Sequence, residues 1–137
     1  MKKYRTRKLI PVILIIVTGV YFQSCYYDHL ESRPCQLTEP EQVSFRTDIL
    51  PVLRTNCSLS GCHSGGSPSG HLNLEDSLAY TELSRSSSGY INTTTPTHSL
   101  FYSQLISTSQ PMPPTGRLDD CTVHLILKWI QQGALNN

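Results

Sequence analysis

The residues best suited to chemistry lie in one short stretch, Cys57-Ser58-Leu59-Ser60-Gly61-Cys62-His63. Two thiols can form a disulfide, bind a metal ion or form thioether bonds to an organic group, and an adjacent imidazole can bind a metal ion from one side. In an unbroken helix the two cysteines would point about 140° apart. We therefore expect the residues between them to leave the helix as a loop, for which Ser58, Ser60 and Gly61 are suitable.

Two simpler interpretations of this stretch are open at this point. Cys57 and Cys62 could form a small disulfide in a secreted protein, with His63 in a solvated loop. The same three residues could instead join His71 in a structural zinc site, although such sites usually contain two clear ligand pairs. Neither interpretation explains Met112, which is the only methionine besides Met1 and lies between two prolines.

Residues 1–24 predict a secretory signal peptide of the lipoprotein type. Five Lys and Arg residues within the first eight positions precede an apolar run over residues 9–22, which is short for a membrane span of about 20 residues. The following Phe22-Gln23-Ser24-Cys25 resembles a relaxed bacterial lipobox, which implies lipidation of Cys25 after cleavage. A permanent anchor helix is the alternative. We expect residues 25–42 to form a tether and lead-in.

The predicted lipid anchor implies a location in the bacterial cell envelope. A lipidated Cys25 would hold the chain at a membrane, facing the periplasm or the cell surface, where the environment is oxidising. The chain after Cys25 has six basic and ten acidic residues, a net charge of about −4, so we expect no nucleic-acid partner. It contains no candidate catalytic dyad, and we therefore do not expect an enzyme.

Apolar spacing predicts an all-α domain with long loops and no strand. We expect the first helix to be capped by Thr47 or Asp48 and to run into Cys57, and the third to be capped by His98 or Ser99. The last helix begins after Asp119 and ends before Gly133, with Trp129 in the core and His124 on a solvated face. The other expected helices lie within residues 43–56, 76–83 and 99–106.

In order and spacing, these segments resemble single-haem cytochrome c domains of secreted bacterial proteins. The resemblance covers residues 43–134 and implies that residues 43–137 form a small cytochrome c-like fold, with three to four short helices and long loops around one haem. It rests on Phe45-x-x-Asp48-Ile49-x-Pro51-Val52, Gly70-x-Leu72-x-Leu74, Ser99-Leu100-Phe101-Tyr102, Met112-Pro113-Pro114 and Lys128-Trp129-Ile130-x-x-Gly133.

The resemblance implies one covalently attached haem c. Cys57 and Cys62 then correspond to the thioether cysteines, His63 to the proximal iron ligand and Met112 to the distal ligand, with His71 as the rival for the distal position. The spacing is C-x4-C-H rather than the usual C-x-x-C-H. The implied function is a one-electron carrier that serves redox partner proteins. The alternatives are a haem domain with an open distal site, associated with a peroxidase or oxidase, and a haem-free, disulfide-stapled lipoprotein that binds a partner.

The remaining cysteines are assigned only through this resemblance. If the haem takes Cys57 and Cys62, then Cys35 and Cys121 are left to form a structural disulfide. Without the haem, the four cysteines beyond Cys25 allow three pairings.

Overall fold

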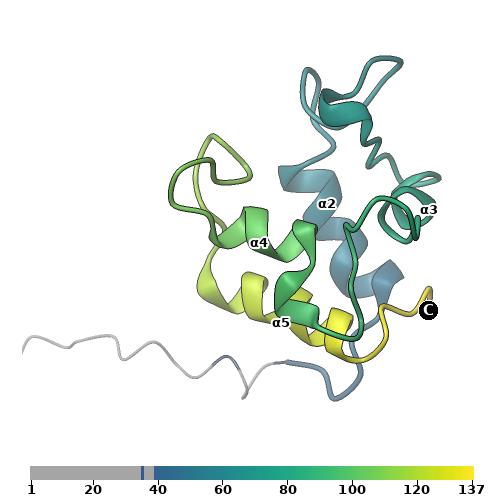
Figure 1. The fold of residues 1–137 in the computed structure, drawn as a ribbon, viewed down its shortest axis with the longest axis vertical. Helices are drawn as coiled ribbons and strands as arrows, with labels where there is room; N and C mark the ends of the chain where they lie inside the picture. Colours follow the sequence, from purple (N-terminus) through teal and green to yellow (C-terminus); the bar gives the residue numbers. More distant parts are fainter. Residues whose placement is uncertain (1–34, 36–38) are drawn as a thin grey trace, which may run out of the picture. The chain divides into compact units, whose positions relative to one another are not determined.

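A computed structural model describes residue 35 and residues 39–137 of the chain. Over this range it contains four α-helices and three shorter helical turns but no strand, so the predicted all-α class is confirmed (Figure 1). The predicted signal peptide and Cys25 lie outside the described residues. The α-helices are α2 (Leu50–Asn56), α3 (Ala79–Leu83), α4 (Leu100–Ile106) and α5 (Asp120–Gln131), and the turns are η2 (Phe45–Ile49), η3 (Ser69–His71) and η4 (Pro96–His98).

The first helical segment begins earlier than predicted. A π-helical turn, η2, leads directly into α2, and its N-cap is Ser44 rather than Thr47 or Asp48. The Ser44 hydroxyl accepts a hydrogen bond from the Thr47 amide at 3.3 Å, and the Asp48 carboxylate accepts one from the Ser44 amide at 2.8 Å. This reciprocal pair satisfies two free N–H groups at the helix start, which a cap at Thr47 would not do.

The core lies where α5 packs against η2 and α4 (Figure 1). The Phe45 ring centroid is 5.4 Å from that of Trp129 and 5.2 Å from that of Tyr80. Trp129 is buried, and its indole N–H donates to the Leu135 carbonyl at 3.0 Å. The predicted core position of Trp129 is therefore confirmed, and its ring packs against Phe45.

Helix α5 follows its prediction at both ends. The Asp119 carboxylate accepts a hydrogen bond from the Thr122 amide at 2.9 Å, and Gly133 has the positive φ, 95°, of a helix stop. The cap of α4 differs, because the Ser99 hydroxyl makes no capping bond. It is fully buried and accepts instead from the Asn92 amide at 2.8 Å, which fixes the preceding loop.

The segment that precedes η2 contacts the polar face of α5. A disulfide joins Cys121 to Cys35, in agreement with the prediction. One and two turns further along, His124 Nδ1 lies 2.6 Å from a Glu39 carboxylate oxygen and Lys128 Nζ donates to the Pro40 carbonyl at 2.9 Å. His124 is still 45% exposed, as predicted, and what the prediction lacked is its contact with Glu39.

Candidate functional site

The candidate site is a cavity of about 300 Å³, which falls at the lower end of the range for ligand pockets. Cys57, Cys62 and His63 line it from the end of α2, and Met112 lines it from the segment between α4 and α5. No Asp, Glu, Lys or Arg lies among the lining residues. Much of the remaining wall is apolar and comes from Leu72, Leu74, Leu100, Phe101, Leu105, Pro113 and Pro114.

The chain between the two cysteines folds into the predicted loop. Cys57 is the last residue to make an α-helical backbone hydrogen bond, which its amide donates to the Leu53 carbonyl at 2.8 Å. The chain then turns through Gly61, whose φ of 79° favours glycine, and the His63 amide returns to the Cys57 carbonyl at 3.1 Å. This turn cancels the angular offset of a five-residue spacing, so both sulfur-bearing side chains line the same cavity.

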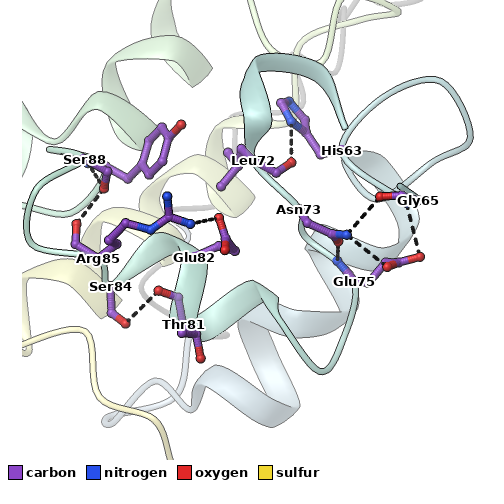
Figure 2. A network of polar contacts seen from close by, with 11 residues as sticks. His63, Gly65, Leu72, Asn73, Glu75, Thr81, Glu82, Ser84, Arg85 and Ser88 are labelled. Atoms are coloured by element: carbon purple, nitrogen blue, oxygen red, sulfur yellow. Dashed lines mark hydrogen bonds and ion pairs between the residues drawn. The ribbon is translucent and has the colours of Figure 1, made fainter. Parts of the chain in front are cut away.

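The imidazole of His63 is held by the extended segment that follows the glycine-rich loop of residues 64–70, called the glycine loop below. Its Nδ1 lies 3.2 Å from the Leu72 carbonyl oxygen, and its own carbonyl accepts from the Leu74 amide at 2.8 Å (Figure 2). Because a carbonyl oxygen can only accept, Nδ1 carries the proton in this contact. The lone pair on Nε2 is then available for a metal, and the imidazole orientation is set by the backbone.

A polar network holds the glycine loop in place behind His63. The Asn73 side-chain amide donates to the Gly65 carbonyl at 3.3 Å, and the Glu75 carboxylate accepts from the Gly65 amide at 3.3 Å (Figure 2). Asn73 also accepts from the Glu75 amide at 2.9 Å. These bonds fix the segment that carries Leu72 and Leu74, and therefore the partner of the His63 ring.

Met112 faces the cavity from a segment tied to α4. Its amide donates to the Gln104 carbonyl at 3.0 Å, and the two prolines after it also line the cavity. His71, the rival iron ligand, is exposed and does not line the cavity, although its neighbours Gly70 and Leu72 do. Of the two predicted candidates for the position opposite His63, only Met112 lines the cavity.

The two cysteines of the site are free thiols in the structure, and Cys57 is buried. Burial, together with the nearby Cys62 thiol, raises the pKa of Cys57 to about 11. The apolar wall therefore favours the neutral thiol over the thiolate that would bind a metal ion. The alternative disulfide between these cysteines is absent from the structure, and residues 39–137 contain no cluster of three or more His, Cys, Asp or Glu side chains placed to hold a metal ion.

Four polar residues of the wall were not predicted, namely Asn56, Ser69, Tyr90 and Gln104. Tyr102, the aromatic neighbour of Phe101, does not line the cavity. Gln104 lies three residues after Phe101 and directly before Leu105, on the apolar face of α4, and this position is a sequence signal that could have revealed it. Tyr90 lies in an irregular loop, where no periodic pattern indicates which side chains face inward.

Comparison with models of known families, with curated proteins and with solved structures found no match to this chain. Among the described helices, none has the length and hydrophobicity needed to cross a membrane.

Proposed function

We propose that this protein is a membrane-tethered, single-haem c-type cytochrome with a cytochrome c-like fold, acting as a one-electron carrier. The observation that carries the proposal is the lining of one cavity by Cys57, Cys62, His63 and Met112 together. A C-x4-C-H sequence alone is compatible with several chemistries. Two thiols, an oriented imidazole and a thioether around one apolar cavity suit a covalently attached haem much better than they suit zinc.

The residues of the cavity fit the needs of haem c. Cys57 and Cys62 would hold the group through thioether bonds, and His63 and Met112 would bind its iron. When bound, haem c supplies a reversible one-electron couple. The Leu72 carbonyl keeps the His63 ring oriented, and the apolar wall excludes water, which favours the less charged, reduced state.

The Met112 thioether supports a carrier rather than an enzyme. A neutral, soft sulfur ligand raises the reduction potential, and a filled sixth position keeps substrates away from the iron. We place the protein in the bacterial cell envelope, tethered through Cys25 and serving redox partner proteins that the sequence does not identify.

The test is the visible spectrum of the mature domain, produced in cells that attach haem to c-type apoproteins. Haem that stays with the polypeptide under denaturing conditions, with the weak red band of oxidised His/Met haem, is the expected result. Covalent haem without that band would favour the open-site alternative. A colourless, folded protein would overturn the proposal in favour of the haem-free lipoprotein. The variant with both Cys57→Ala and Cys62→Ala is the matched control and should lose covalent haem.

A further inference from the structure

Glu39 is a buried carboxylate that lies outside the hydrophobic core. Its side chain is 6% exposed, and one of its oxygens lies 2.6 Å from His124 Nδ1. The other oxygen, Oε2, accepts no hydrogen bond from the described residues, and Lys128 Nζ lies 3.8 Å from it. Burial of a carboxylate is costly unless opposite charges or hydrogen-bond donors compensate for it. Because both compensating groups belong to α5, the burial of Glu39 depends on the lead-in lying against this helix.

Backbone groups next to this carboxylate bond to the same side of α5. Lys128 Nζ donates to the Pro40 carbonyl at 2.9 Å, and the side-chain amide of Gln132, the C-cap of α5, donates to the Glu41 carbonyl at 2.8 Å. Steps of three and four residues place side chains along one stripe of a helix. The lead-in contacts such a stripe, which consists of residues 121, 124, 128 and 132. The disulfide is the first contact of this stripe.

The Glu39 contacts and the disulfide hold the lead-in at neighbouring positions. Cys35 is four residues before Glu39, and Cys121 is one helical turn before His124. Contacts that dock the lead-in on α5 without the disulfide would keep the two thiols close together, which raises their effective concentration for each other. A higher effective concentration favours the closed disulfide over the two separate thiols.

We propose that Glu39 is a positioning residue for the Cys35–Cys121 disulfide, because its contacts with α5 hold the lead-in in place in the dithiol form. Closure is a thiol–disulfide exchange with a low-molecular-weight disulfide such as oxidised glutathione. One protein thiolate attacks this disulfide and releases a thiol, and the second protein thiolate then displaces the other thiol from the mixed disulfide. The two protein thiols lose two protons and two electrons, and the small disulfide gains them to become two thiols. The inference does not depend on haem.

The test is the equilibrium constant for closure of this disulfide, measured on the mature protein in buffers of reduced and oxidised glutathione. Peptide mass spectrometry after acid quenching and alkylation reports the Cys35–Cys121 disulfide separately from the other cysteines. Glu39→Ala should lower the constant about tenfold, the lower end of the range for a hydrogen bond to a charged group. Glu41→Ala is the matched control and should leave the constant unchanged, because Glu41 is exposed and bonds to α5 through its backbone carbonyl.

Two further measurements separate positioning from a general loss of stability. In concentrated denaturant, where the lead-in and α5 are unfolded, Glu39→Ala and the wild type should have equal closure constants. His124→Ala removes the partner of Glu39 on α5 and should also lower the native constant, so it decides the question if Glu39→Ala fails to fold. Equal native constants for Glu39→Ala and Glu41→Ala would overturn the inference. A Glu39→Ala loss of the same size in denaturant would overturn it as well.

Discussion

Met112 is the residue that distinguishes a carrier from an open haem site. It lines the cavity, whereas His71 is exposed and outside it. Met112→Ala should abolish the red band of the oxidised protein and lower its reduction potential while covalent haem is retained. His71→Ala is the control and should leave both unchanged. A red band that survives in Met112→Ala would assign the distal ligand to another residue.

Cys57 gives the site a specific pH dependence. Its pKa is raised from an ordinary value of 9.0 to about 11, mainly by burial. The folded state therefore disfavours the thiolate, so the contribution of Cys57 to stability is complete below about pH 9 and is lost as the pH rises to about 11. We expect haem-free protein to lose about 2 to 3 kcal/mol of unfolding free energy over this range through Cys57.

Denaturant unfolding at pH 8 and pH 11 measures this loss. Between pH 8 and pH 11, haem-free Cys57→Ala should lose about 2 to 3 kcal/mol less unfolding free energy than the wild type. Haem-free Cys62→Ala should lose nearly as much as the wild type. Haem-loaded protein should not show the Cys57 contribution, because a thioether sulfur does not titrate. An alkaline loss that persists in haem-loaded protein, and disappears in haem-loaded Cys57→Ala, would mean that Cys57 is not bonded to the haem.

The residues of the site differ in how far the sequence could predict them. Cys57, Cys62 and His63 were found by residue type and spacing, and Met112 through the resemblance to cytochrome c domains, with its rarity and flanking prolines in support. Gln104 and Tyr90 are common residue types whose role depends on which way a side chain faces. That direction is set by the packing of α4 and by an irregular loop, which no local pattern encodes.

At the scale of the elements, Asp119 controls the start of the longest helix. Its carboxylate accepts hydrogen bonds from Thr122, and these lower its pKa below the ordinary value. Asp119→Ala should reduce the unfolding free energy by about 1 kcal/mol at pH 7. A lowered pKa means that this contribution is present above about pH 4 and is lost as the pH falls, so the difference between variant and wild type should shrink at pH 2.

Urea unfolding of both proteins at the two pH values gives the comparison. Asp120→Ala is the matched control, since its side chain is 91% exposed and its partner Arg117 is 3.8 Å away. It should change stability by only a few tenths of a kcal/mol. An Asp119→Ala variant as stable as Asp120→Ala at pH 7 would contradict the capping role.

The helices also show where local patterns stop being informative. The periodic stripe, cap and glycine stop of α5 were readable because each is a local signal. The start at Ser44 was missed because a π-helical turn precedes α2 and places the cap three residues before Thr47. The contacts of His124 and Lys128 with Glu39 and Pro40 were missed because they join segments more than 80 residues apart.

At the scale of the whole molecule, the folded domain is small, and the cavity occupies space beside its hydrophobic core. A chain of this length buries a modest fraction of its surface, and the cavity removes part of the packing that α2 and α4 could make. We therefore expect covalent haem to be a structural element as well as the redox centre. The Cys35–Cys121 disulfide ties the lead-in to the first turn of α5 in the same unit.

That disulfide joins residues separated by 86 positions, and η2, α2, α3 and α4 lie within its loop, whereas nearly all of α5 lies outside it. By the chain-entropy model, removing it should lower the unfolding free energy by about 4 kcal/mol. The variant with Cys35→Ser and Cys121→Ser should show this loss in denaturant unfolding while keeping the spectrum and potential of the wild type, because neither residue lines the cavity. Wild-type protein with the disulfide reduced is the matched control and should lose the same amount. A double variant that unfolds at the wild-type denaturant concentration would contradict the chain-entropy account of this disulfide.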